Sequence, residues 1–344
     1  MEYLNLLDGE TLVQISNDFD YIKATADFYG LKLFPLFKTE NMKLAVANLM
    51  DGSEIPVMSF VHALDTEARI GDRPNYQELK FELLLIKEKL NQGEAIRKKL
   101  FDYGMTQTEQ NLLEAIYNDA ANLISRVLTR MEVMADELLS TGKITVNEND
   151  VNVTIDFKLP ITHQIGVTGW ELATADIIGD LVSIKATAKN KIQRALVPEK
   201  IMGYMLKNTA IKNIAASYQP VQYATQEWIL AYLKSLLNIE FIVTSGTYKK
   251  SAQDDTEYYF FKQDVITFLT TEGEVGKTFV TTTPEEDYGI SDYTNGYVAI
   301  TQYKTEDPAG MWTKASAVAL PCPANINSIY LCTVSETPED DEGP

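Results

Sequence analysis

The sequence predicts an α+β fold in which one long helix packs against strands that lie before and after it in the chain. Residues 106–141 carry an uninterrupted helical pattern of apolar residues. Short apolar stretches separated by turn residues, typical of strands, lie on both sides of this helix. Of the 344 residues, 45% are hydrophobic, so the chain can bury a large core, and its length suggests two or three substructures.

The long helix has a start, an apolar face and an end that can be read from the residues. Thr106 and Glu109 form a capping box, Gly142 supplies a stop, and no proline or glycine falls between them. Apolar residues recur every three or four positions, so one face packs along a rod of about 50 Å. These residues are Leu112, Ile116, Ala120, Leu123, Val127, Met131, Met134 and Leu138.

The polar side of this helix is expected to carry good helix formers, Glu132 and Glu137 among them. Periodicity alone is typical of a coiled-coil dimer as well as of a long core helix. The flanking hairpin-like segments favour packing of the apolar face against strands of the same chain.

Composition excludes several classes of protein. A formal net charge of -19 is the opposite of the clustered Lys and Arg that grip nucleic acid phosphates. The start of the chain is acidic, unlike a basic signal peptide, and no apolar run approaches the roughly 20 residues of a membrane span. We therefore expect a protein made and kept in the cytosol, or released by lysis. Cys322 and Cys332 are expected to be free, buried thiols.

The charge is distributed unevenly along the chain. Residues 185–212 hold seven basic side chains against one acid, whereas residues 254–307 hold twelve acids against three lysines. Such asymmetry could let copies of the chain dock head to tail, although scattered solvated faces explain it equally well.

The first third of the chain predicts two segments that need a neighbour. Residues 1–30 contain six acids, one lysine and no clear period, which suits an arm that orders only against another subunit. Strand-like residues 42–49 and 55–61 follow. Residues 63–81 then resemble a long hairpin-like excursion with its tip near residues 71–75, because turn-forming residues occupy its middle.

Strands and helices alternate without an internal repeat after the long helix. Residues 144–146 and 151–157 predict a hairpin around a polar turn. Helices are expected at residues 175–189, after Pro198 and at residues 225–237. Strands are expected at residues 241–244, 265–269, 279–282, 297–303 and 328–334, followed by an acidic tail.

One segment comes close to a phosphate-binding loop. Residues 271–278 end in Gly276-Lys277-Thr278, but Thr271 stands where such a loop needs its first glycine. The motif should also open a helix, whereas the next residues favour a strand. We therefore expect a loop between strands and keep a P-loop-like NTPase only as an alternative.

Other chemistry-bearing residues do not form a recognisable site. His62 and His163 are the only histidines, and neither has a metal-ligand spacing with cysteine or carboxylate. Adjacent acids such as Glu285 and Glu286 are usually solvated. The sequence thus predicts no catalytic residue, no metal and no cofactor. An arm and a protruding loop instead favour a repeating assembly of identical subunits.

Several short motifs resemble the lambda-like major capsid protein E family of tailed bacteriophages. Residues 34–37 precede the first strand, residues 55–59 lead into 67–70 and 73–74, and Thr283-Pro284-Glu285 follows Gly276. Asp307-Pro308, Leu320-Pro321 and Asn327-Ser328-Ile329-Tyr330 resemble the closing strands of the family. The likeness covers nearly the whole chain in layout. Tail-tube and portal proteins are alternatives within the same class of virion components.

The resemblance implies the tailed-phage and herpesvirus type of major capsid fold. Its parts would be an N-terminal arm (1–35), an extended-loop region (36–95) and a peripheral domain (96–161) with the spine helix. An axial domain (162–295), strands that return to the peripheral domain (296–335) and an acidic tail (336–344) would follow. The resemblance also implies hexamers and pentamers around double-stranded DNA, no membrane, and portal, scaffolding and decoration proteins as partners.

Inter-subunit contacts are expected at two places. The first is the loop tip, and the second is the basic segment that would face acidic loops of a neighbour. The residues are Arg69, Ile70, Asp72, Arg73, Pro74, Tyr76, Lys189, Lys191 and Arg194.

Overall fold

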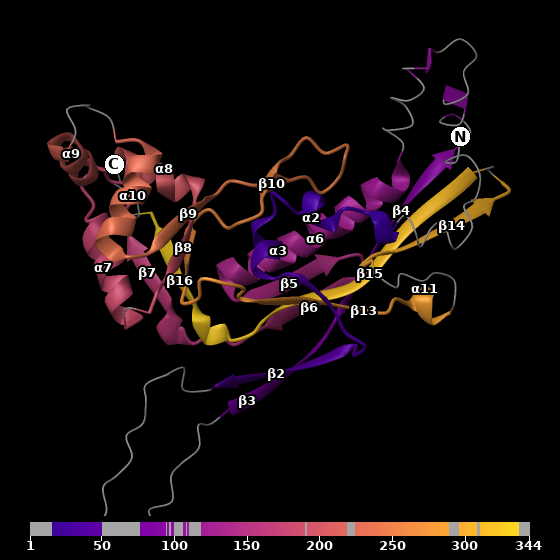
Figure 1. Cartoon of the computed structure of the whole chain (residues 1–344), viewed down its shortest axis with the longest axis horizontal. Coiled ribbons are helices and arrows are strands. Elements are labelled where there is room, and N and C mark those ends of the chain that lie inside the picture. Colours follow the sequence, from indigo (N-terminus) through magenta and orange to yellow (C-terminus); the bar gives the residue numbers. More distant parts are fainter. Residues whose placement is uncertain are drawn as a thin grey trace, which may run out of the picture.

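Two hydrophobic cores, each built around a five-stranded sheet, make up the body of the molecule in the computed structural model (Figure 1). The structure describes residues 16–49, 76–93, 95, 98–99, 106–107, 109, 118–189, 191–218, 224–288, 296–307 and 310–336. Within these residues, no helix combines the length and apolarity needed to cross a bilayer. The mixture of helix and sheet agrees with the predicted α+β class.

Helix α6 (Asp119–Thr141) lies at the centre of the first core. It is shorter than the predicted helix of residues 106–141, because Asn118 has non-helical dihedral angles and caps the helix by accepting a hydrogen bond from the Ala121 N–H. The predicted stop is confirmed, since Gly142 adopts a left-handed conformation at the C-cap. The capping box also forms: the Thr106 and Glu109 backbone N–H groups donate to each other's side chains over 2.8 and 3.3 Å. The long pattern is therefore broken at Asn118.

The first sheet covers one side of α6, and its central strand is β15 (Gly310–Pro323). One edge of β15 pairs with β4 (Leu84–Gly93). Along the other edge, the first part of β15 pairs with β14 (Ala299–Thr305), and its last part pairs with β13 (Gly276–Thr281). Strand β1 (Leu36–Lys38) adds to β13 in parallel. The ends of the expected extended-loop region, β1 and β4, thus belong to the main sheet. Strand β13 was expected in the axial domain but lies in this sheet as well.

A hairpin of β2 (Lys43–Leu49) and β3 (Tyr76–Glu82) extends away from the body (Figure 1). Its register runs from Lys43 opposite Glu82 to Leu49 opposite Tyr76. The predicted excursion is therefore antiparallel at its base, and it begins at residue 43 instead of residue 63. Residues 50–75, which include its expected tip, lie outside the described part of the chain.

The predicted hairpin after α6 is confirmed as β5 (Lys143–Glu148) and β6 (Val151–Asp156). Its two turn residues, Asn149 and Asp150, have φ of 49° and 63°. Asn and Asp tolerate this left-handed conformation, which a tight two-residue turn between twisted strands requires.

The second sheet has the order β7 (Gln164–Thr168), β16 (Ile329–Ser335), β12 (Val265–Leu269), β8 (Arg194–Pro198) and β9 (Glu240–Thr244). Helices α7 (Ile177–Thr187), α8 (Glu199–Lys207), α9 (Thr209–Tyr218) and α10 (Gln226–Leu237) lie beside it at one end of the molecule (Figure 1). Three of these helices match predicted ones, and α9 does not. Strand β16 was expected to return to the peripheral domain, and it pairs with β7 and β12 of the second sheet. Its residues alternate between the two cores, because Ile329 and Leu331 belong to the first core whereas Cys332 and Val334 belong to the second.

The N-terminal segment folds on this chain's own core from Ser16 onward. Helices α2 (Tyr21–Ala24) and α3 (Tyr29–Leu33) precede β1, and Leu31, Leu33 and Phe34 are buried. An arm of residues 1–35 that orders only on a neighbour is therefore wrong for residues 16–35, because its later residues are apolar. Residues 1–15 lie outside the described part.

Short elements complete the fold. They are η2 (Ile161–His163), β10 (Thr247–Tyr248), β11 (Tyr258–Tyr259), α11 (Pro284–Asp287) and η3 (Ile326–Ser328). Both cysteines are free and buried, as predicted, and burial raises the pKa of each thiol to about 12.

Truncating the centre of α6 should destabilise the whole molecule. Leu128 is 0% exposed, so Leu128→Ala leaves a cavity and should lower the free energy of unfolding by about 2–5 kcal/mol. The matched control is Leu172→Ala at a residue that is 52% exposed, where a change within about 0.5 kcal/mol is expected. Urea unfolding followed by circular dichroism measures both. Equal losses in the two variants would contradict the placement of α6 in the core.

Candidate assembly surfaces

The expected loop contacts fall mostly beyond the described residues. Arg69, Ile70, Asp72, Arg73 and Pro74 lie outside this part of the chain. Tyr76 is the first residue of β3 and is paired with Leu49 of β2. Tyr76 therefore lies at the outer end of the described part of the hairpin, where the strands lead into residues 50–75.

The three basic residues expected at the second contact do not act together. Lys189 follows α7 with φ of 51°, and Lys191 lies two residues on; both are exposed. Arg194 is only 8% exposed, and its Nε donates to the Thr271 carbonyl over 2.9 Å. Its guanidinium also donates to the Gly273 carbonyl. The donors of Arg194 are therefore used to hold the loop between β12 and β13, leaving Lys189 and Lys191 as the exposed pair.

The segment of residues 271–278, which resembles a phosphate-binding loop in sequence, has a packing role. Gly276 opens β13, and a Cβ there would lie 2.1 Å from the Cys322 carbonyl oxygen, so glycine permits the close approach of β15. The Lys277 ammonium lies 4.3 Å from the centre of the Phe37 ring. A strand follows the motif, as predicted, in place of the helix whose N-terminus would bind phosphate.

The titratable groups considered in the sequence have structural partners. His163 is buried, stacks on Tyr330 at 3.8 Å, and its Nδ1 lies 3.1 Å from the Ile329 carbonyl oxygen. Burial lowers the pKa of His163 despite this hydrogen bond, so the ring is neutral at pH 7. Glu285 accepts a hydrogen bond from Lys314. Burial acts to raise the pKa of Glu285, but hydrogen bonds, foremost that of Lys314, lower it overall.

The candidate metal ligands are scattered over the structure. Among the described residues, no three His, Cys, Asp or Glu side chains gather as a metal site would require. His62 is outside that set.

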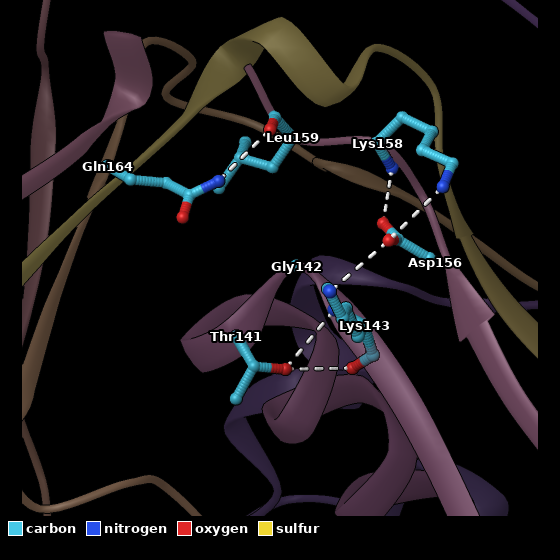
Figure 2. Close-up of a pocket in the computed structure, with 7 residues that line it drawn as sticks. All are labelled: Thr141, Gly142, Lys143, Asp156, Lys158, Leu159 and Gln164. Carbon is cyan, nitrogen blue, oxygen red and sulfur yellow. Dashed lines mark hydrogen bonds and ion pairs between the residues drawn. The ribbon is translucent and has the colours of Figure 1, made fainter. Parts of the chain in front are cut away.

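A small hollow of about 190 Å³ lies where α6 ends and the second part of the chain begins (Figure 2). Asp156 lies between two lysines, 3.2 Å from the Lys143 ammonium and 3.4 Å from that of Lys158. Gln164 donates to the Leu159 carbonyl over 3.1 Å. The polar groups around the hollow therefore bind one another, and they brace the junction between hairpin β5–β6 and strand β7.

Features typical of association lie on the outside. Ile22 is 85% exposed, and Ile161 and Tyr288 are each 83% exposed. Strands β7 and β9 form the two edges of the second sheet. Single exposed apolar residues are common on protein surfaces, whereas the edge of a sheet presents N–H and C=O groups to which a strand of another polypeptide can bind. Within the described residues, β7 and β9 are therefore the places best suited to such pairing.

Two functional candidates were missed in the sequence. Glu132 was expected on the polar side of the long helix, but it is 1% exposed, and Asp136 is 3% exposed. Their spacing of four residues, next to the apolar Met131 and Ala135, is the signal that two acids share a buried face of the helix.

Comparison with known proteins identifies the fold. Among solved structures, the chain is similar to a protein provisionally identified as the capsid protein of a prophage of E. coli CFT073, with a TM-score of 0.62 and 16% identity over 96% of this chain and 99% of that chain. It is also similar to a phage-related protein from Bordetella bronchiseptica RB50, with a TM-score of 0.54 and 12% identity over 96% and 97% of the two chains. No curated protein matches the chain.

The family is established by a match over most of the chain. Residues 34–334 match the family described as Phage major capsid protein E. The fold is accordingly that of tailed-phage major capsid proteins, and the protein is a self-associating structural subunit of an icosahedral phage shell, located in the virion capsid. This chain belongs to the phage major capsid protein E family.

Proposed function

We propose that copies of this chain form hexamers and pentamers, and that the β2–β3 hairpin of each copy lies across a neighbour. The hairpin carries this proposal. Within the described residues, β2 and β3 pair with each other and with no strand of either main sheet. A two-stranded hairpin is at best marginally stable alone in water, so a neighbouring surface that covers it would stabilise it.

The second sheet and its helices form the axial part in this proposal. They lie together at one end of the molecule, which suits a position around an axis where five or six copies meet (Figure 1). Their sheet order favours residues 164–269 together with β16 as the axial part, in place of residues 162–295. Helix α6 and the first sheet would then form the wall of the shell.

The remaining partners follow from this role. We expect assembly in the host cytoplasm with portal, scaffolding and decoration proteins, around double-stranded DNA that is not bound by sequence. The net charge of -19 opposes adhesion of the DNA phosphates to the protein. Such a lumen would let the duplex slide during packaging.

The purified chain should assemble by itself or with its scaffolding protein. Negative-stain electron microscopy should show closed polyhedral particles or rings of five and six subunits. Lone monomers under all assembly conditions, or rings of another symmetry, would contradict the proposal.

Shortening the loop should block shell closure without unfolding the subunit. We propose deleting residues 70–75 and retaining Tyr76, because Tyr76 pairs with Leu49 at the end of the hairpin. The variant should remain soluble with the wild-type thermal unfolding midpoint, yet form no closed particles in the microscope. A second variant replaces the same six residues by Gly and Ser and so separates the effect of length from that of sequence. Wild-type shells from the deletion variant would contradict a role for this loop in assembly.

Reversing the exposed basic pair should weaken assembly in a salt-dependent way. In Lys189→Glu/Lys191→Glu, acids would face the acidic loops of a neighbour, and like charges across an interface cost several kcal/mol unless salt screens them. Light scattering should show fewer particles at low salt and partial recovery at high salt. Arg194 is left unchanged because its bonds lie within the chain.

The matched control, Lys87→Glu/Lys249→Glu, makes the same change in net charge at two exposed lysines outside both the basic segment and the acidic segment. It should leave particle yield close to that of the wild type. Equal impairment in both variants would indicate general repulsion and would remove the docking proposal.

A further inference from the structure

Two buried carboxyl groups join the N-terminal segment to helix α6. Glu132 Oε1 accepts the Gly30 N–H over 2.7 Å, and Glu132 Oε2 accepts the Leu31 N–H over 2.7 Å. Asp136 lies one turn further along α6, and its carboxyl group adjoins that of Glu132, since a Cβ at Gly30 would lie 2.7 Å from Asp136 Oδ1 and 3.0 Å from Glu132 Oε2. These bonds connect positions about a hundred residues apart in the chain, so they fix the segment to the helix.

Glu132 supplies the N-terminal cap that helix α3 lacks locally. The residue before α3, Phe28, offers no side-chain cap. A carboxylate that receives the first free N–H groups of a helix stabilises it through charge-assisted hydrogen bonds. The start of α3 therefore depends on the ionised form of a residue on another helix.

Asp136 must carry a proton for the pair to hold together. Two carboxyl groups can hydrogen-bond each other only when one of them is protonated. Burial, and then the charge of Glu132, raise the pKa of Asp136 well above its usual value. Burial raises the pKa of Glu132 as well, but the Gly30 and Leu31 N–H groups oppose this. The proton consequently resides on Asp136, which donates it to the Glu132 carboxylate.

The fit around the pair is close on the side of α3. A Cβ at Gly30 would lie 2.7 Å from Asp136 Oδ1 and 2.9 Å from the Ala135 Cβ. The absence of a side chain at Gly30 lets the backbone reach the carboxyl pair. The pair and the segment are thus complementary in shape as well as in hydrogen bonding.

Charged groups from the neighbouring elements do not neutralise the pair. Tyr29 of α3 faces Asp136, and Arg194 of β8 and Glu240 of β9 both act on Tyr29. Besides burial, Glu132 alone shifts the pKa of Asp136. From β5 and β12, the contacts with this end of α6 are neutral: the Thr145 N–H donates to Glu137, and the Thr267 hydroxyl donates to the Leu139 carbonyl. Among the described residues, no cation therefore acts directly on Asp136 to offset a second negative charge at the pair.

We propose that Glu132 and Asp136 form a proton-operated latch, which holds the segment of residues 29–34 on α6 while they share one proton and releases it when that proton is lost. The latch is a property of the isolated chain and does not depend on shell formation.

The direction of the pH dependence follows from linkage. In the released state Asp136 meets water, and its pKa returns to its ordinary value. Between that value and the raised pKa of the closed state, opening releases one proton, so the opening equilibrium constant rises about tenfold per pH unit. Above the raised pKa it rises no further. The segment is thus held most firmly at acidic pH and loosens as pH increases.

Hydrogen exchange of the full-length chain tests the latch. Mass spectrometry should follow the amides of residues 29–34 from pH 5 to pH 9, with correction for the intrinsic exchange rate. In the wild type, the opening constant should rise with pH by up to about tenfold per unit. In Asp136→Asn this rise should be markedly smaller, because the amide can still donate to Glu132 but does not titrate, which leaves Glu132 as the only titrating member of the pair. Asp27→Asn, at an exposed acid two residues before this segment, is the matched control and should keep the wild-type slope.

Two results would overturn the proposal. One is a wild-type opening constant that does not change with pH, and the other is the same slope in Asp136→Asn as in the wild type. If Asp136→Asn does not fold, infrared spectroscopy of the wild type decides. The C=O stretch of a protonated carboxyl group should persist at pH values above the ordinary titration range of aspartic acid, and its loss within that ordinary range would overturn the latch.

Discussion

The burial of α6 is the constraint on which the rest of the structure depends. Fourteen of its 23 residues are buried, so the helix is covered on more than the single stripe of an ordinary amphipathic helix. The covering elements come from distant parts of the chain: α3, β4, β5, β12, β15 and β16. Because they must all fit one rod, their positions are fixed relative to one another. The first core is built around this rod, and strands β12 and β16, which contact it, also contribute residues to the second core.

Local signals predicted those parts of the fold whose partners are close in sequence. Strand β12 was predicted with the bounds that it has, and the hairpin around Asn149 and Asp150 was predicted from its turn residues. The local pattern did not predict the central strand β15, although the family resemblance placed returning strands at residues 296–335. It contains Pro321 and Pro323 and is buried along most of its length, so it lacks the alternation that marks a half-exposed strand. Its neighbours β4 and β13 come from opposite ends of the chain, which no local pattern reveals.

The candidate contacts show the same limit for charge. A count of basic residues between 185 and 212 treats Arg194 like Lys189, but one is buried and the other is exposed. What separates them is that Arg194 begins a strand in the middle of a sheet, where its head reaches the carbonyls of residues 271 and 273. The prediction for Glu132 was wrong because helix propensity suggests a solvated side chain. Its hydrogen-bond partners lie in α3, about a hundred residues away in the sequence, so no local pattern reveals its burial.

The two cores are joined too closely to move as independent domains. The chain crosses from one sheet to the other between β12 and β13 and again between β15 and β16. Arg194 donates to the Thr271 carbonyl in the first of these connections. The Thr267 hydroxyl donates to the Leu139 carbonyl over 2.7 Å, and this hydrogen bond ties the second sheet to α6. A change of angle between the cores would break these buried hydrogen bonds, each costly to leave unmade. In the proposed hexamers and pentamers, the angle between the two cores of a subunit would therefore stay constant. The different positions of neighbouring subunits in the two rings would be accommodated by projecting parts such as the β2–β3 hairpin.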